Sequence, residues 1–344
     1  MDIIRKPRPA VTHRTRRWMT QDMTSNTSHA KPNIDVYLAS PRGFCAGVVL
    51  AVDIVELAIK KHGAPVYVKH QIVHNPIVVA ETERKGAITV ENVTDVPEGS
   101  VVVFSAHGSP PSDYEEAAKR NLTVIDATCP LVTRVHNEAK KYSREGMNII
   151  LVGHRGHQEV IGSTGQTDMS LIDEREGVNV PDFGENAKVA VLTQTTLSVR
   201  DTAEAISEIE KKYPGALVRN DICYATTNRQ QAASQLSELV ELVLVIGAQN
   251  SSNCNRLKEV AESRGVRSFL INGPEELDRS WLTGVTRVGI TSGASTPETS
   301  VAAVIKAINP ANVIHIGQGN ENITFRLPAE LQAEAKKRAK GTGT

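Results

Sequence analysis

The sequence predicts an α/β fold made of three similar small modules, each with a mostly parallel sheet, placed around a central cleft. Short β-branched runs alternate with helical patterns along most of the chain, which is typical of strand–helix units around parallel sheets. A lone cysteine stands at a strand-to-helix junction three times, at Cys45, Cys129 and Cys223, with spacings of 84 and 94 residues. This weak internal repeat indicates pseudo-threefold symmetry.

The strands are predicted from short apolar, β-branched runs bounded by turn residues. In chain order they cover residues 36–40, 66–70, 101–108, 123–128, 148–154, 189–195, 242–248, 267–271 and 287–293. The helices are predicted from apolar residues at helical spacing. They cover residues 48–61, 115–120, 132–143, 230–240, 255–263 and 297–308. Lys60 and Lys61 before Gly63, and Pro130 before the helix that stops at Gly146, are ordinary helix end signals.

The modules are expected at residues 34–128, 129–222 and 223–310, with a C-terminal extension over 311–344. Residues 1–33 carry seven Lys or Arg, two Asp and little apolar periodicity, which predicts a disordered basic tail. An organelle transit peptide is the alternative for this tail, but it holds no clear cleavage site. Plastid import is therefore less expected than a bacterial cytoplasm, and the end of the chain reads as a solvated helix.

The composition excludes several classes of protein. The chain has 39 basic and 39 acidic residues, so no net charge attracts nucleic acid or a membrane. Aromatic residues make up only 4% of the chain, which argues against a base-stacking surface. The longest apolar runs are too short to span a bilayer. Four cysteines in 344 residues do not form a disulfide framework.

The three junction cysteines suggest a metal centre. A helix N-terminus presents free N–H groups, and it is expected to lower the pKa of a thiol and favour a metal-binding thiolate. Three thiolates from three modules suit either zinc with an open position or a cluster with one free iron. The spacing alone is a weak signal, since no local C-x-x-C motif is present, and three unrelated core cysteines remain an alternative.

Polar residues follow most of the predicted strands. They include His74, His107, His154, His157, Glu159, residues 193–196, residues 250–253 and residues 292–296. Ligands of parallel α/β folds bind at the carboxyl ends of the strands. Each Ser, Thr or Asn alone reads as an ordinary N-cap. Several such loops together with loop histidines indicate a bound anion, and we expect a phosphorylated ligand.

Several stretches resemble the family of 4-hydroxy-3-methylbut-2-enyl diphosphate reductases, also known as the LytB/IspH family. They are PRGFCAG, HQIVHNP, SAHG, DATCPLV, GHRGHQEVIG, TQTTLS, DICYATTNRQ, NSSN and TSGAS, in family order from about residue 34 to about 325. The family carries out the last step of the methylerythritol phosphate route to isoprenoids. The resemblance implies three α/β domains around a 4Fe-4S cluster, and a reaction that removes an allylic hydroxyl with two electrons and two protons. The products would be isopentenyl and dimethylallyl diphosphate.

The resemblance also implies roles for particular residues. Cys45, Cys129 and Cys223 would bind the cluster and leave the fourth iron open for substrate. The diphosphate would be held by His74, His107, Ser251, Ser252, Asn253 and Ser295. The substrate's alcohol and the proton path would lie along His157, Thr195 and Glu159, with Thr196 supporting its neighbour in the substrate site. Glu159 is the expected general acid, because a carboxyl with a raised pKa can donate a proton.

Two residues near these motifs are expected to play lesser parts. Cys254 follows Asn253 directly and is read as a small residue near the site, since a fourth cysteine ligand would block the open iron. His154 is expected to support its neighbours or to pack in the core. The expected electron donor is a ferredoxin or a flavodoxin, and the chain is expected to act as a monomer.

The sequence is also compatible with two other functions. One is a zinc-dependent hydrolase of a phosphorylated small molecule, which would use the same three thiolates. The other is an iron–sulfur regulator whose basic N-terminal arm binds nucleic acid. The balanced charge and the few aromatic residues argue against the regulator.

Overall fold

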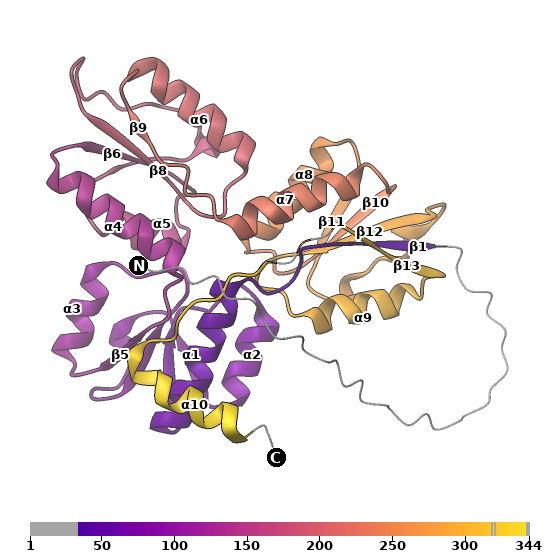
Figure 1. The fold of residues 1–344 in the computed structure, drawn as a ribbon, viewed down its shortest axis with the longest axis horizontal. Helices are drawn as coiled ribbons and strands as arrows, with labels where there is room; N and C mark the ends of the chain where they lie inside the picture. The colour runs from indigo at the N-terminus through magenta and orange to yellow at the C-terminus, as the bar shows by residue number, and fades with distance from the viewer. Residues whose placement is uncertain (1–33, 318, 320, 342–344) are drawn as a thin grey trace.

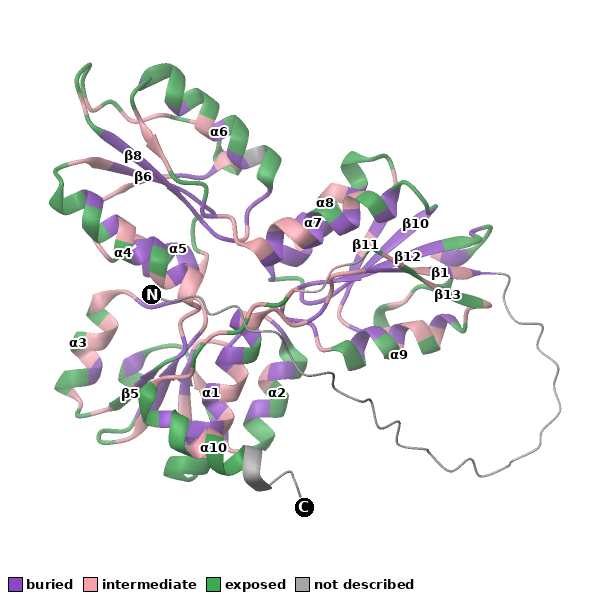
Figure 2. Ribbon diagram, in the orientation of Figure 1, coloured by how far each residue is buried: buried purple, intermediate pink, exposed green. Residues whose placement is uncertain are grey.

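The computed structural model describes residues 34–317, 319 and 321–341, and within them the chain forms three lobes that meet at the centre of the view (Figure 1). Each lobe contains one parallel sheet of four or five strands. Because helices cover these parallel sheets, the central strands are buried while the outer helix faces are exposed (Figure 2). The prediction of an α/β fold with three parallel sheets is therefore confirmed for the described residues.

The sheet of the first lobe has the strand order β3-β2-β4-β5. Its strands are β2 (Val66–Lys69), β3 (Ala87–Val90), β4 (Val101–Phe104) and β5 (Thr123–Asp126). The helices of this lobe are α1 (Ala46–His62), α2 (Pro76–Arg84) and α3 (Pro111–Lys119). The apolar face of α1 packs on one face of the sheet, with Ile54 and Val55 fully buried against Val66 and Val103.

The second sheet has the order β7-β6-β8-β9. Its strands are β6 (Asn148–Val152), β7 (Ser170–Ile172), β8 (Val189–Thr193) and β9 (Leu217–Val218). Its helices are α4 (Pro130–Arg144), α5 (Gln158–Thr164) and α6 (Val199–Lys212). The buried residues Val135, Ala139 and Tyr142 share one face of α4 and pack against the sheet, as the sequence periodicity predicts.

The third sheet has the order β11-β10-β12-β1-β13. Its strands are β1 (Asp35–Ala39), β10 (Leu242–Ile246), β11 (Arg267–Ile271), β12 (Arg287–Ser292) and β13 (Asn312–Ile316). Its helices are α7 (Tyr224–Ser237), α8 (Ser252–Ser263) and α9 (Glu298–Ile308). Alternate residues of β10 face opposite cores: Val243 packs with α7 and α8, while Leu244 packs with α9.

Strand β1 joins the third sheet, although the sequence analysis placed residues 34–128 together. It pairs in parallel with β12 on one side and β13 on the other. The chain then leaves this sheet through the loop before α1 and builds the first lobe. A strand pattern specifies that a segment is extended, but it does not specify the distant segment with which the strand pairs.

The C-terminal residues return from the third lobe to the first. After β13, the chain passes beside the start of α1 and ends in α10 (Gln332–Gly341), which packs on α1 (Figure 1). Leu331 is fully buried in the core of the first lobe. Short 3-10 turns lie at Val93–Asp95, Glu174–Glu176, Pro274–Glu276, Arg279–Leu282 and Ala329–Leu331.

Several elements were not predicted, namely β3, β7, β9, β13, α2, α5 and α6. The four strands lie at sheet edges, and edge strands are short and partly exposed, so their apolar pattern is weak. Helix α5 contains Gly162 and Ser163 in a stretch of only seven residues, so it lacks a clear helical pattern. Among the described helices, none has the length and apolarity needed to cross a membrane.

Candidate active site

Each of the three junction cysteines is the N-cap residue of a long helix. Cys45 precedes α1, Cys129 precedes α4, and Cys223 precedes α7. The three helix starts come from three lobes and converge at the centre of the molecule (Figure 1). All three cysteines line one cavity. The placement of the cysteines at helix starts is therefore as predicted.

The backbone ties each cysteine to a loop that carries other predicted site residues. Every one of the three cysteine amides donates to a carbonyl in a loop that follows a strand. The pairs are Cys45 to Ala294 at 3.1 Å, Cys129 to Ala106 at 3.0 Å and Cys223 to Thr195 at 3.0 Å. Ala294 precedes Ser295, and Ala106 precedes His107. The thiols and the polar loops are thus held in fixed relation by main-chain hydrogen bonds.

Two of the three thiols lie beside the same glycine. A Cβ atom at Gly47, on the first turn of α1, would stand 2.7 Å from the Sγ of Cys129 and 3.8 Å from the Sγ of Cys45. Only glycine therefore leaves the space beside these two sulfurs open. Thr226 supports the third thiol, since its amide donates to the Sγ of Cys223 at 3.4 Å and its hydroxyl lies 3.2 Å from the same atom.

The pKa values of the thiols are shifted in the direction opposite to the prediction. Burial raises the pKa of Cys45, and burial together with the neighbouring cysteine thiols raises the pKa of Cys129. Burial and the nearby Cys45 raise the pKa of Cys223 to about 11. The expected lowering at helix N-termini is therefore wrong, because desolvation, joined at Cys129 and Cys223 by repulsion from neighbouring thiols, outweighs the helix N–H groups.

These features fit a metal centre that brings its own positive charge. Three half-buried thiols that line one cavity favour the thiolate form only when a cation neutralises them. Sulfur donors of this kind suit iron–sulfur clusters and zinc. Gly47 keeps open the space beside two of the sulfurs, and all three cysteines line the same cavity. The residues present therefore fit an iron–sulfur cluster.

All the residues predicted for the substrate line the same cavity. They are His74, His107, His157, Glu159, Thr195, Thr196, Ser251, Ser252, Asn253 and Ser295. They come from all three lobes, at or near the carboxyl ends of strands, where parallel α/β folds bind ligands. Among the described residues that line this cavity, none is Lys or Arg.

Three histidines form one wall of the cavity. The rings of His74 and His107 are stacked with centroids 4.0 Å apart, and His157 lies edge-on to His74 at 5.3 Å. Burial lowers the pKa of His74 to about 4, that of His157 to about 3, and that of His107 well below its usual range. The three rings are therefore neutral at pH 7.

The orientation of the histidines leaves hydrogen-bonding capacity toward the cavity. The Nδ1 of His157 accepts from the amide of Glu159 at 3.2 Å, so a neutral ring carries its proton on Nε2. The Nε2 of His74 is buried and has no hydrogen-bond partner among the described residues. A buried polar atom without a partner is costly, which indicates that a ligand completes this site.

Asn253, which lines the cavity from the third lobe, gives the same indication. Both its side-chain nitrogen and its side-chain oxygen are buried, and neither has a partner in the described part of the chain. It lies in the first turn of α8, two residues after Ser251, the N-cap. Ser252 donates to the carbonyl of Thr196 at 3.2 Å, and Ser295 donates to the carbonyl of His74 at 3.0 Å. These contacts join loops from different lobes around the cavity.

Glu159 is the carboxyl of the site, and it is buried. Its Oε1 accepts from the amide of Thr195 at 2.6 Å, and its Oε2 accepts from the Thr195 hydroxyl at 2.9 Å. Burial raises the pKa of Glu159 to about 7, and the nearby Asp221 adds to this rise against the opposing hydrogen bonds from Thr195. The carboxyl can therefore hold or release a proton near neutral pH.

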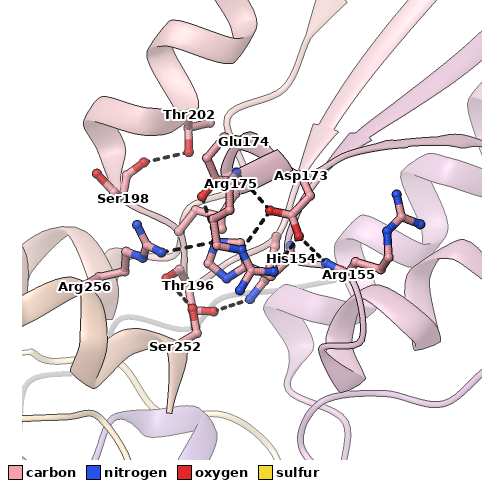
Figure 3. Close-up of polar contacts among 12 residues, drawn as sticks. His154, Arg155, Asp173, Glu174, Arg175, Thr196, Ser198, Thr202, Ser252 and Arg256 are labelled. Carbon is pink, nitrogen blue, oxygen red and sulfur yellow. Dashed lines mark hydrogen bonds and ion pairs between the residues drawn. The ribbon is translucent and has the colours of Figure 1, made fainter. Parts of the chain in front are cut away.

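His154 lies beside the cavity rather than in it. Its Nε2 pairs with Glu174 at 2.7 Å, and its amide donates to Gln194 at 2.9 Å (Figure 3). His154, Asp173 and Glu174 lie close enough to resemble a metal site. However, Arg175 pairs with Asp173 and holds the pKa of that carboxyl far below its usual range. We therefore regard this group as a support for the loop before His157.

Cys254 is placed away from the cavity. Its side chain is fully buried in the core between α7, α8 and the third sheet. A Cβ atom at Gly247 or Gly293 would come within 2.3 Å or 2.2 Å of its sulfur. The residue packs behind the loops that follow β10 and β12.

Thr226 and Gly47 also line the cavity, although the sequence did not predict them as site residues. Each lies in the first turn of a helix that a cysteine opens, at position 3 after Cys223 and position 2 after Cys45. Their short distance from the cysteines along the chain was the available signal.

Comparison with known proteins agrees with this geometry. The family model described as "LytB protein" matches residues 36–309. A protein of Bradyrhizobium diazoefficiens named 4-hydroxy-3-methylbut-2-enyl diphosphate reductase 2 is 51% identical over 308 residues, which cover 87% of this chain and 100% of that protein. A reductase of the same name from Glaesserella parasuis is 47% identical over 309 residues, covering 87% of this chain and 98% of the relative.

Solved structures give the same result. The E-1-hydroxy-2-methyl-but-2-enyl-4-diphosphate reductase of Plasmodium falciparum matches with a TM-score of 0.84 and 36% identity, over 90% of this chain and 100% of that one. A second structure, of (E)-4-hydroxy-3-methyl-but-2-enyl diphosphate reductase, matches with a TM-score of 0.59 and 34% identity, over 80% and 99% of the two chains. The chain therefore belongs to the LytB family.

Proposed function

We propose that this protein is a reductase that removes the allylic hydroxyl of 4-hydroxy-3-methylbut-2-enyl diphosphate. The C–O bond breaks, and two electrons and two protons are consumed. One proton leaves with the hydroxyl as water and the other adds to the carbon skeleton, which gives isopentenyl or dimethylallyl diphosphate. The observation that carries the proposal is that one cavity joins three convergent thiols, a buried carboxyl and unpartnered polar atoms. The names of the relatives supply the substrate.

Cys45, Cys129 and Cys223 would hold a 4Fe-4S cluster in this protein. When bound, such a cluster supplies electrons and an iron with Lewis acidity, whereas zinc has no redox chemistry. Gly47 keeps the space beside two of the three sulfurs open. Three protein ligands for four irons leave one iron free for the substrate.

The diphosphate would lie between the histidine wall and the start of α8. Asn253 and the Nε2 of His74 have unused hydrogen-bonding capacity there. Ser251, the N-cap of α8, stands at a helix end that favours negative charge. His107, Ser252 and Ser295 line the same part of the cavity. Since the described lining holds no Lys or Arg, neutral donors and the helix terminus would hold the anion.

The proton for the departing hydroxyl would come from Glu159. With a pKa of about 7, this carboxyl holds a proton in a substantial share of molecules at neutral pH. The Thr195 hydroxyl bonded to it can both donate and accept, so a proton can pass from Glu159 through Thr195 into the cavity. The Nε2–H of His157 would donate to the substrate's alcohol, and Thr196 would keep the loop in place.

One of the two alternative functions loses its support. The relatives are named reductases, so the zinc-dependent hydrolase is not retained. The nucleic-acid-binding arm of the regulator falls in residues 1–33, which lie outside the described residues. A ferredoxin or flavodoxin as electron donor, action as a monomer and a cytoplasmic location stay predictions, as do the module boundaries.

A turnover assay tests the proposed function. The protein would be purified and reconstituted with iron and sulfide without oxygen, and then given reduced methyl viologen and the substrate. We expect dye oxidation that depends on the substrate, with both five-carbon diphosphates among the products. A protein loaded with its cluster that leaves the substrate unchanged would contradict the proposal.

A further inference from the structure

Arg229 on α7 is a charged side chain that is completely buried, with a relative exposure of 0%. Such burial requires a partner, since an unpaired charge is costly inside a protein. The partner is Glu321, in the segment that follows β13. The Nη1 of Arg229 lies 2.9 Å and 3.1 Å from the two oxygens of Glu321, and its Nη2 lies 3.1 Å from one of them. Asn228 donates to the same carboxylate at 3.1 Å.

The other hydrogen bonds of Arg229 reach the backbone beside two of the three cysteines. Its Nη2 donates to the carbonyl of Gly43 at 2.8 Å, and its Nη1 donates to the carbonyl of Ala225 at 2.9 Å. Gly43 stands two residues before Cys45, and Ala225 stands two residues after Cys223. One guanidinium group therefore links the loop that carries Cys45 to the helix that Cys223 opens.

Glu321 itself is held in place by the C-terminal segment. Gly319 passes so close to Pro41 that a Cβ atom there would come within 2.3 Å of the proline ring. Further along, Phe325, Leu327 and Leu331 pack into the core around α1. The segment thus runs from the third lobe to the first and crosses beside the loop of Cys45 (Figure 1). The carboxylate of Glu321, which belongs to this segment, thereby lies against Arg229.

We infer that the Arg229–Glu321 pair is a brace that sets the spacing between the Cys45 loop and the start of α7. The C-terminal segment is accordingly a structural part of the metal centre, although it lies beyond residue 309, where the family match ends. The inference rests on the proposed function, since it takes Cys45 and Cys223 as ligands of the cluster. Arg229 and Glu321 are positioning residues, because neither touches the cavity lined by the thiols.

The chain offers a matched control for the brace. Arg42 lies in the same loop and pairs with Glu298, with its Nε at 3.1 Å from the carboxylate. The side chain of Glu298 is 57% exposed, whereas that of Glu321 is 13% exposed. An exposed pair contributes little to stability. Glu298→Gln therefore removes a carboxylate that binds the same loop, but from the surface.

The experiment measures cluster loss in anaerobically reconstituted protein. Iron release to a chelator is followed by absorbance in the wild type, Glu321→Gln, Glu298→Gln and Arg229→Lys. Loss of a residue that orients metal ligands typically weakens metal binding by about 10–100-fold, so we expect release from Glu321→Gln to be faster by about that factor. Arg229→Lys should behave like Glu321→Gln, because lysine keeps the charge but lacks the planar fork. Glu298→Gln should stay within about twofold of the wild type.

Hydrogen exchange of the metal-free proteins separates a local effect from unfolding. The brace predicts faster amide exchange over residues 41–47 and 223–227 in Glu321→Gln, while β10 keeps its protection. Unchanged exchange in those two segments, or iron release equal to that of Glu298→Gln, would overturn the inference and leave the proposed function standing. A wild type that takes up no cluster would overturn both. Loss of protection in β10 as well would show a role in global folding and would also contradict the brace.

Discussion

Glu159 and Thr195 are joined by two hydrogen bonds, one to each oxygen of the carboxyl. The Thr195 amide fixes Oε1 at 2.6 Å, and the hydroxyl meets Oε2 at 2.9 Å. The carbonyl of Thr195 also accepts a hydrogen bond from the amide of Cys223 at 3.0 Å. One threonine therefore links the buried carboxyl to the backbone of a cysteine. This relation links the proposed proton source to a proposed ligand of the metal centre.

The first prediction concerns Glu159 as the proton donor. Glu159→Gln keeps the shape of the side chain and a carbonyl oxygen, but it cannot supply a proton. Positioned acid catalysis is worth about 10²–10⁴-fold, and we expect turnover to fall by that range. Iron content should stay at the wild-type level, since the proposed ligands of the cluster are the three cysteines and not Glu159. A near-normal turnover number in steady-state kinetics would exclude Glu159 as the donor.

The second prediction is a pH dependence. Burial raises the pKa of Glu159 from its ordinary value of 4.5 to about 7, and the protonated form is the acid. Turnover should therefore fall as the pH rises through about 7, approaching a tenfold loss for each further unit. The residual rate of Glu159→Gln should lack this decline. A wild-type profile that stays flat from pH 6 to pH 9 would show that another group supplies the proton.

The same shift affects stability, with a sign that follows from linkage. The folded-state pKa lies above the ordinary value, so the folded protein binds the Glu159 proton more tightly than the unfolded chain. This contribution to stability is complete below about pH 4.5 and is lost as the pH rises to about 7. The free energy of unfolding of Glu159→Gln, measured relative to the wild type, should therefore rise across that window.

The third prediction concerns Asn253. Both polar atoms of its side chain are buried and lack partners among the described residues, so we expect the diphosphate to use them. Asn253→Ala should raise KM more than it lowers kcat, by about 10-fold or more, as for loss of a hydrogen bond to a charged group. Asn137→Ala, on the exposed face of α4, is the control. An unchanged KM in Asn253→Ala would remove the residue from the diphosphate site.

The fourth prediction uses Gly47. Alanine at this position adds a methyl group 2.7 Å from the Sγ of Cys129, so it should block the space for a metal centre. Alanine also favours a helix over glycine by about 1 kcal/mol. We expect Gly47→Ala to lose most of its iron while the metal-free protein unfolds at the same or a higher temperature.

Gly215→Ala is the control for that prediction, because nothing lies within 4 Å of a Cβ atom there. It should keep its iron. Wild-type iron content in Gly47→Ala would show that the metal centre does not use the space between these thiols.

The central strands and most of the long helices could be predicted because their patterns are local, whereas α6 and the edge strands β3, β7, β9 and β13 were not predicted. The predicted site residues line one cavity for a general reason, since parallel strands present their carboxyl-end loops at one edge of a sheet. The pairing of β1 with β12 and β13 could not be read in this way. Pairing between segments more than 250 residues apart depends on the tertiary fold, not on the strand pattern.

The electrostatics of the site also depend on the tertiary fold. The helix starts at Cys45, Cys129 and Cys223 suggest lowered thiol pKa values, yet burial and mutual proximity raise them. No pattern in the sequence marks Arg229 as buried, and only the folded chain brings Glu321 to it. Burial and distant partners are properties of packing, and a single sequence does not display them.

The most direct test of the account is an iron and sulfide count on anaerobically prepared protein, with its absorption spectrum. We expect about four irons and four sulfides per chain and a broad absorption band near 400 nm. Cys254→Ser should match the wild type, because Cys254 packs in a core away from the cavity, whereas Cys129→Ser should lose the cluster. A colourless protein with one zinc, or with no metal after reconstitution, would contradict the claim that the three cysteines hold an iron–sulfur cluster.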